Sequence, residues 1–465
     1  MQKREHTPSK GAAPKQYREI QDGDSPLLDR RYATRRTPVA APIEAYHPVF
    51  AYFLAEYARE DLDPPSEIVS HTMKLMDSAS QIATREAQRA ESTRDALSDL
   101  LRHPVVQTVN PNLTSSDHML LYMRQEDPRG SAAMIIIEEK YELGQSGEGC
   151  VQGSLSYHAH WIQDRGSLHK SCICPSFIIS IAGPFIAVCG AIWTSDIIIQ
   201  HLTGYMWMGR SGDIEEDRLL RVSRMFYALQ RAVIRLKHYY EHLDPEIIDD
   251  KYRRFFPLAT SYRDSNGTRV VFKYAAFLKE KDPSCVTFLA TLEGSEQKVV
   301  VKFVERYGEE EHRLLAQHGY APRLLYHGHI WDVEDNLEGE TSVDVNAGCG
   351  TRRMVVMEYV EGKTLDNMDA DVSREDVRKA LHGIIDIMHQ QKMVHGDIRT
   401  PNILLTGADQ LDVKKRIRVL DFDWAGQEGI VRYPYGLSRD VKWAEGVEDH
   451  ALIRKEHDVI MIGRV

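Results

Sequence analysis

The stretch MVHGDIRTPNILL, residues 393–405, decides the fold of this chain because it sets polar side chains at fixed spacing between apolar ends. Asp397 follows His395 by two residues, and Asn402 follows Asp397 by five. The preceding segment SREDVRKALHGIIDIMHQQ, residues 373–391, has an N-cap serine and one apolar face, which is typical of a helix. The spacing therefore predicts a loop, directly after a helix, that carries a carboxylate and an amide.

A second carboxylate is expected beside this loop. Asp421 heads the sequence DFDWAG at the end of the apolar run RIRVL, and the short connection GADQLDVKK joins that run to NILL. The two runs are predicted to form a hairpin that brings Asn402 and Asp421 together. Carboxylate and amide oxygens are hard ligands that suit Mg²⁺ better than zinc, so these two residues are the predicted metal ligands.

Lys302 lies inside the apolar run VVVKFV. A buried ammonium is costly unless a carboxylate pairs with it, and the alternative is an edge strand that exposes the lysine to water. An acidic helix, EEEHRLL, follows after a short gap. We expect Glu310 to be the partner of Lys302, because it lies one helical turn before Leu314 on the expected buried face.

The segment VVMEYVEGKTL, residues 355–365, resembles the hinge of protein kinases and lies in register between VVVKFV and HGDIRTPN. With these elements in order, residues 260–465 resemble the protein-kinase superfamily. They are most similar to a fungal kinase-domain family marked by VHGDIRxPN, DFDWAG and RYP. The resemblance implies an α+β fold, with a two-lobed kinase-like domain and a short C-lobe over 260–465, behind a separate α/β N-terminal domain.

The resemblance also implies roles for the residues above, with ATP and Mg²⁺ as cofactors. Phosphoryl transfer needs a positioned carboxylate, metal ligands and a cation on the phosphates. Asp397 is the expected catalytic base, and Arg399 is expected to steady the transferred phosphoryl group. Expected ATP contacts are made by Lys302, Glu310, the back-pocket residue Met357, and the backbone of Glu358 and Val360; the expected Mg²⁺ ligands are Asn402 and Asp421.

Three departures from the kinase pattern keep alternatives open. Gly396 stands where such kinases usually carry arginine, Asp423 replaces the glycine of Asp-Phe-Gly, and FKYAAFLKEKDPSC, residues 272–285, contains no glycine to cradle phosphates. The leading expectation is a Ser/Thr protein kinase with a protein substrate. The alternatives are a small-molecule phosphotransferase resembling aminoglycoside and choline kinases, and a catalytically silent nucleotide-binding module.

The N-terminal part is predicted as a disordered basic tail over 1–45 and an α/β domain over 46–245. Glu138 and Lys140 end the apolar run MIIIEEK. Together with Asp117 and Gln152 they resemble the magnesium site of the restriction-endonuclease-like (PD-(D/E)xK) fold, which crinkler-like effectors pair with a kinase. A plain structural sheet is the alternative. A zinc site is disfavoured by the spacing in a second group, which comprises His158, His160, His169, Cys172 and Cys174.

Composition gives expectations about the number of domains, the partners and the cellular compartment. A chain of 465 residues with 42% hydrophobic content is expected to form two or three globular domains. The net charge of −11 disfavours nucleic acid as a partner, except through the N-terminal domain. Six scattered cysteines indicate an intracellular protein, cytoplasmic or nuclear. The apolar segment 177–193 is broken by Gly183-Pro184, so two buried strands are predicted there rather than a membrane span.

Overall fold

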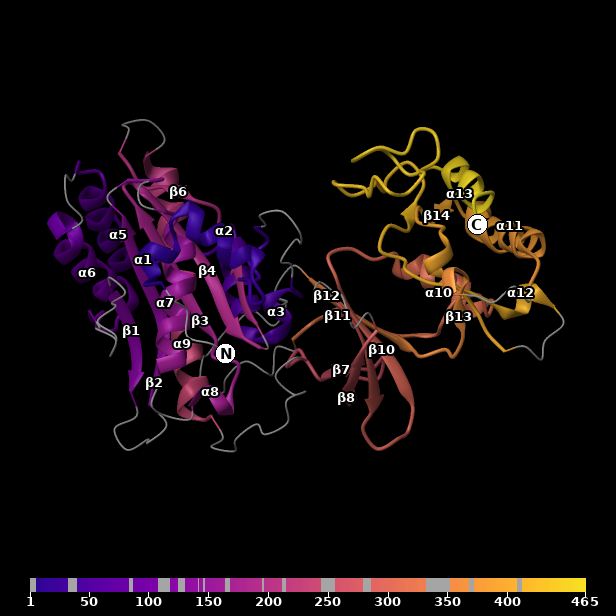
Figure 1. Cartoon of the computed structure of the whole chain (residues 1–465), viewed down its shortest axis with the longest axis horizontal. Helices are drawn as coiled ribbons and strands as arrows, with labels where there is room; N and C mark the ends of the chain where they lie inside the picture. Colours follow the sequence, from indigo (N-terminus) through magenta and orange to yellow (C-terminus); the bar gives the residue numbers. More distant parts are fainter. Residues whose placement is uncertain are drawn as a thin grey trace. The chain divides into compact units, whose positions relative to one another are not determined.

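The computed structural model describes residues 6–31, 40–82, 87–107, 118–123, 130–140, 142–144, 147–163, 168–194, 196–210, 215–243, 256–278, 286–331, 352–367, 372–407 and 412–465. The chain is an α+β protein that divides into two compact units (Figure 1). The first is built on Met1–Ala259. The second is built on Thr260–Glu280, Val286–Ile330 and Arg352–Val465.

The first unit is organised around one sheet. Its strands are β1 (His118–Met123), β2 (Ser131–Lys140), β3 (Ser176–Ala182), β4 (Phe185–Trp193), β5 (Ile197–His201) and β6 (Met206–Trp207). The order is β1-β2-β3-β4-β5, and β6 pairs with β4. Only β2 and β3 pair in parallel among the pairings of the described strands, and α7 (Gly149–Gln163) connects them. Strands β3 and β4 form a hairpin, which confirms the prediction for residues 177–193.

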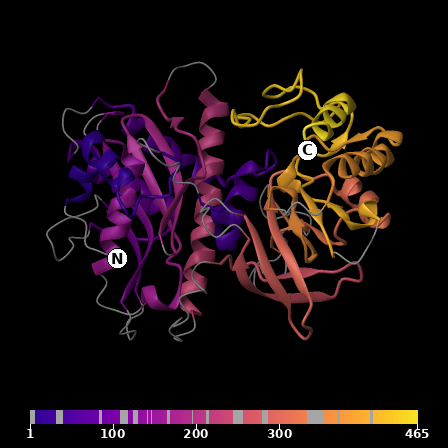
Figure 2. The ribbon, with the colours of Figure 1, turned by 45° about the vertical axis from the view of Figure 1, so that its right-hand side comes forward.

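Helices cover both faces of this sheet. Phe177 of β3 packs edge-to-face on Phe50 of α4 (Pro48–Ala58), whereas its neighbour Ile178 faces Gly153 of α7. Adjacent residues of a strand point to opposite faces, so α4 and α7 lie on opposite sides. Double coverage explains the unbroken apolar strands. On the α4 side lie α5 (Ser66–Ala79), α6 (Ala87–Leu101) and the long α9 (Glu215–Glu241, Figure 2).

The prediction of a disordered tail over 1–45 is wrong for the described residues 6–31 and 40–45. They include helices α1 (Pro8–Gly11), α2 (Pro14–Asp22) and α3 (Ile43–Tyr46). Leu27 is fully buried, and the backbone of Leu28 pairs with Ile197 and Ile199 beside β5. A few apolar side chains anchor a segment that is polar on average, and a proline begins each of α1 and α2 where its missing N–H costs nothing.

The second unit begins with an antiparallel sheet in the order β11-β12-β10-β9-β8-β7. The strands are β7 (Ser261–Arg263), β8 (Arg269–Phe277), β9 (Thr287–Leu292), β10 (Lys298–Val304), β11 (Leu324–His329) and β12 (Arg353–Glu358). One helix, α10 (Glu309–Gln317), follows β10. The central strand β10 pairs with β9 and β12, so Lys302 lies in the middle of the sheet rather than at an edge.

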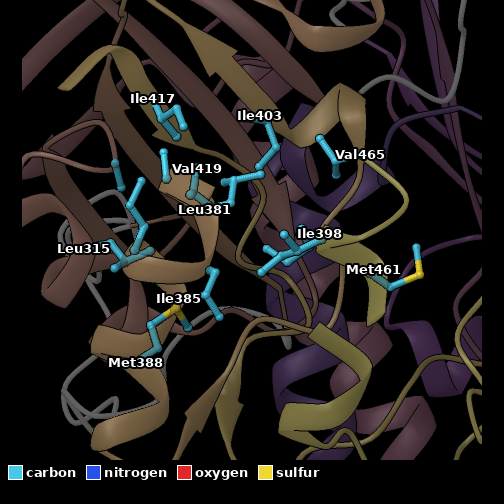
Figure 3. Packing of buried hydrophobic residues seen from close by; sticks show 14 of the residues in the cluster. Leu315, Leu381, Ile385, Met388, Ile398, Ile403, Ile417, Val419, Met461 and Val465 are labelled. Atoms are coloured by element: carbon cyan, nitrogen blue, oxygen red, sulfur yellow. The ribbon is translucent and has the colours of Figure 1, made fainter. Parts of the chain in front are cut away.

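The rest of the second unit is built on α11 (Arg374–Gln390), which Ser373 caps as predicted. Its apolar face enters a core that includes Leu381, Ile385 and Ile398, shown in Figure 3. Strands β15 (Ile403–Leu405) and β16 (Ile417–Val419) pair antiparallel, which confirms the predicted hairpin. The remaining elements are β13 (Lys363–Thr364), η3 (Leu365–Asn367), β14 (Met393–Val394), η4 (Thr400–Asn402), α12 (Val413–Arg416), β17 (Gly426–Gln427) and α13 (Lys455–Ile462), together with α8 (Leu168–Ser171) of the first unit.

Among the described helices, none is both long and apolar enough to cross a membrane.

Candidate active site

The loop at residues 395–399 is anchored by hydrogen bonds to the buried carboxylate of Asp458 on α13. Asp458 is 1% exposed and accepts hydrogen bonds from the backbone N–H of His395 at 2.9 Å and of Gly396 at 2.8 Å. Its Oδ2 also lies 3.1 Å from Nε2 of His389. Sequence reasoning missed Asp458, because it lies among the polar residues that begin α13 (KEHDVIMI) and no local pattern marks it as buried.

Asp397 is almost fully buried, at 4% exposure, and its carboxylate is held by two side chains. Arg399 makes a bidentate interaction with it, in which Nε donates to Oδ1 at 2.5 Å and Nη2 donates to Oδ2 at 2.7 Å. The amide nitrogen of Asn402 donates to Oδ2 at 2.7 Å and to the Asp397 carbonyl at 3.0 Å. Because a carboxylate oxygen accepts about two hydrogen bonds, Oδ1 keeps capacity for one further donor.

Asn402 and Asp421 meet as predicted, through the hairpin. The backbone N–H of Leu420 donates to the carbonyl of Asn402 at 2.8 Å, which sets Asp421 next to the loop. Since Asp397 takes the amide nitrogen of Asn402, the Asn402 side-chain oxygen is the atom left for a cation. Asp421 has a left-handed φ of 65°, a strained conformation for a residue with a side chain. The donor set of carboxylate and amide oxygens fits Mg²⁺.

Lys302 is buried and pairs with two carboxylates from the strand end after β16. Its ammonium lies 2.8 Å from Oδ1 of Asp421 and 2.6 Å from Oδ1 of Asp423. Burial alone would lower the pKa of Lys302, but these two carboxylates raise it. The lysine is therefore a fixed positive charge between the two aspartates.

The predicted pairing of Lys302 with Glu310 is wrong. Glu310 is exposed, because α10 begins at Glu309 and turns Glu311 inward instead. Glu311 is 3% exposed, and burial raises the pKa of its carboxyl. Asp423 supplies the second negative charge that a glutamate was expected to provide.

The two aspartates beside Lys302 differ in the pKa of their carboxyl groups. Burial opposes ionisation of Asp421, but the ammonium of Lys302 outweighs it and lowers the pKa of Asp421 to about 2. Burial raises the pKa of Asp423 to about 7, with the charge of Asp421 acting in the same direction. Asp421 is thus the carboxylate that stays charged, as a metal ligand must.

Phe422 links α10 to the loop. Its ring stacks on His312 with centroids 4.6 Å apart and meets His395 edge-to-face at 5.1 Å. Burial lowers the pKa of His312 to about 4, so its ring is neutral. Nε2 of His312 then donates to the Pro322 carbonyl, and Nδ1 accepts from the Tyr307 hydroxyl. The stack fixes Asp421 and Asp423 on either side of Phe422.

The segment predicted as a hinge follows β12. Met357 is buried, at 8% exposure. The N–H of Glu358 donates to the Arg323 carbonyl at 3.0 Å, and its carboxylate accepts from the Arg323 N–H. Among the described residues, the N–H of Val360 has no hydrogen-bond acceptor. The backbone donor expected to face adenine is thus available.

Two departures from the kinase pattern, Gly396 and Asp423, lie within the described residues and affect the packing and ion pairing around them. Gly396 has φ of 81°, and a Cβ placed there would lie 2.8 Å from Ile453 Cδ1. No larger residue, arginine included, fits without moving Ile453. Asp423 acts as the second partner of Lys302. The segment between β8 and β9, where a glycine loop was sought, lies outside the described residues from 279 to 285.

In the first unit, Glu138 and Gln152 come together as predicted. Glu138 is fully buried, and its two oxygens accept from Gln152 Nε2 at 2.6 Å and from Ser156 Oγ at 2.5 Å. Lys140 is 6% exposed. Asp117 lies outside the described residues, so the metal-binding set is not assembled by the part of the chain that the structure describes.

Comparisons with known proteins add the following. No family model matches the chain, and no curated protein matches it. Many solved structures resemble part of it, among them two kinases. The Cydia pomonella granulovirus kinase PK-1 has 17% identity and a TM-score of 0.30, over 41% of this chain and 65% of that one. Vaccinia related kinase 3 has 14% identity and a TM-score of 0.30, over 45% of this chain and 66% of that one.

Both matches therefore span less than two thirds of the neighbour's own length. Likeness this distant carries no functional argument. The element order of the second unit agrees with the order that the kinase resemblance implied: a sheet with one helix, a connecting segment, a long helix, a polar loop and a hairpin. The resemblance to a fungal family and that to an endonuclease-like domain stay predictions.

Proposed function

We propose that the second unit is an ATP-dependent phosphotransferase that acts on a Ser or Thr hydroxyl of a protein. The observation that carries this proposal is one polar path built from separate stretches of sequence. It runs from Asp397 to Asn402 at 2.7 Å, through the backbone to Asp421, and on to Lys302 at 2.8 Å. These groups supply a base, metal ligands and a phosphate-binding cation, the set that phosphoryl transfer requires.

Each of these groups has a separate role in the proposed reaction. Asn402 Oδ1 and Asp421 would hold Mg²⁺, which supplies charge neutralisation on the nucleotide phosphates when bound. The substrate hydroxyl donates to Asp397 Oδ1, the oxygen with an open acceptor position. The hydroxyl oxygen forms a bond to the γ-phosphorus as the bond to the ADP oxygen breaks, and the hydroxyl proton passes to Asp397. Arg399 orients the Asp397 carboxylate through Nε and Nη2 and retains Nη1 for a phosphoryl oxygen.

The test is transfer of label from γ-labelled ATP by the full chain in Mg²⁺, offered casein and histones in one reaction. Asp397→Asn should reduce label transfer by about a hundredfold or more, because proton transfer to a positioned base is worth about 10²–10⁴ in rate. Asp386→Asn is the matched control, since Asp386 is an exposed aspartate on α11. Equal transfer by both variants would refute the role of Asp397.

A small-molecule acceptor is the second candidate, because Gly396 and Asp423 both depart from protein kinases and both departures are built into the packing described above. A panel of aminoglycosides, choline and sugars in the same assay separates the two. Label found only in a metabolite favours the second candidate. Nucleotide binding without transfer to any acceptor would favour a silent binding module instead.

A further inference from the structure

Three metal-ligating side chains converge in the first unit, away from the residues that sequence analysis had considered for zinc. Cys150 lies in the first turn of α7, and Cys189 of β4 pairs across the sheet with His201 of β5. One ligand atom from each lies within 4.8 Å of the other two. Within the described part of the chain, this is the one such group of three that could hold a metal ion.

The distance between the Cys189 sulfur and the His201 nitrogen matches that expected on a tetrahedral metal ion. With Zn–S of about 2.3 Å and Zn–N of about 2.0–2.1 Å, a sulfur and a nitrogen on one tetrahedral ion lie about 3.5 Å apart. Sγ of Cys189 and Nδ1 of His201 are 3.5 Å apart. No disulfide joins Cys150 and Cys189, so both sulfurs are available as ligands.

Burial and access also suit an ion. Cys150 is 2% exposed and Cys189 is fully buried, so the sulfurs are shielded from bulk water. His201 is exposed, so the group of three borders solvent at this residue. All three residues lie on a helix or on paired strands rather than on loops, so their positions are fixed before an ion arrives.

A hydroxyl group lies close to one of the three ligand atoms. The Tyr205 hydroxyl lies 3.6 Å from Sγ of Cys150 and 3.2 Å from Oγ of Ser180. It also hydrogen-bonds to the carboxylate of Glu148. Glu148 in turn lines a pocket of about 570 Å³ together with Tyr17 and other residues. A water bound to an ion here would have a hydroxyl partner and a nearby opening.

We propose that Cys150, Cys189 and His201 bind one soft divalent cation, Zn²⁺, with a water in the fourth position beside Tyr205. Thiolate and imidazole ligands select zinc over magnesium or calcium. Three protein ligands with an open fourth position are the pattern of zinc sites that exchange a ligand, whereas purely structural sites are closed by four.

Among the described residues, the two cysteines of the segment 158–174 belong to no such group. Sγ of Cys172 lies 3.5 Å from the Leu168 carbonyl, and Sγ of Cys174 lies 3.7 Å from the carbonyl of Cys172. Each of these sulfurs thus has a backbone oxygen within contact distance. Cys172 therefore serves as a control thiol outside the proposed group.

The first experiment measures bound zinc by elemental mass spectrometry on the full chain, purified without chelator. We expect about one zinc per chain in the wild type and in Cys172→Ser. His201→Asn should fall to about a tenth of that or less, and this exposed position allows the variant to fold. Circular dichroism confirms the fold of each variant.

The second experiment replaces zinc with cobalt. Cobalt bound by two thiolates and an imidazole gives ultraviolet charge-transfer absorption and intense visible bands. These bands should persist in Cys172→Ser and disappear in His201→Asn and in Cys189→Ser. Absence of zinc in the wild type together with no stoichiometric cobalt spectrum would overturn the proposal. So would full zinc content in His201→Asn, or a Cys150–Cys189 disulfide found by peptide mass mapping.

Discussion

Replacing Asp458 by asparagine should loosen the loop that carries Asp397. The carboxylate accepts three hydrogen bonds, two of them from consecutive backbone N–H groups in a buried site. Asparagine has only one side-chain oxygen that can accept a hydrogen bond. Its NH₂ group would take the place of the second oxygen and face one of the backbone N–H donors. One buried N–H is left unsatisfied, at about 1–3 kcal/mol, and the remaining bonds lose their charge-assisted part. We expect a total cost of about 3 kcal/mol for opening this loop.

Hydrogen exchange measures this cost directly. A loss of about 3 kcal/mol corresponds to exchange about a hundredfold faster at the amides of His395 and Gly396. Phosphotransfer should fall as well, because Asp397 loses its fixed position. Asp440→Asn is the control, since Asp440 is exposed and its replacement should cost less than about 0.5 kcal/mol. If the two variants exchange alike at residues 395 and 396, the anchoring role of Asp458 is refuted.

Three other substitutions test separate parts of the structure. Asp421→Asn should weaken Mg²⁺-dependent ATP binding while Glu310→Gln leaves it unchanged, and equal affinities by calorimetry would contradict the metal assignment. Gly396→Ala should destabilise the second unit by about 1–3 kcal/mol, because of its positive φ and the contact with Ile453; an unchanged urea midpoint would argue against that geometry. Leu27→Ala should destabilise the first unit by about 2–5 kcal/mol, as expected of a fully buried leucine, whereas a freely mobile segment would show no change.

The parts of the second unit that sequence predicted well are those where local pattern and chemistry agree. The hairpin that joins Asn402 to Asp421 follows from two apolar runs with a short polar connection. The helix before the loop follows from its cap and its apolar face. In both cases each residue's own preference points to the observed structure, so no distant contact had to be known.

The failures depend on contacts between distant residues. The choice of Glu310 required the phase of a helix whose first residue was not fixed by sequence, and an error of one residue turns the side chain by about 100°. Asp458 was missed because its partners lie more than sixty residues earlier in the chain. The segment around Leu27 looked disordered on average composition, which hides the few side chains that anchor it.

The arrangement of Lys302 between Asp421 and Asp423 also bears on the order in which ligands arrive. With Asp421 ionised and the pKa of Asp423 near 7, the three groups carry between zero and one net negative charge at neutral pH, which favours a divalent cation over uncomplexed ATP. To reach a phosphate, the ammonium must give up at least part of its contact with the aspartates, and a metal ion at Asp421 would replace the charge that it withdraws. Under the proposed function, metal and nucleotide therefore favour each other's binding, and free nucleotide competes poorly with its magnesium complex.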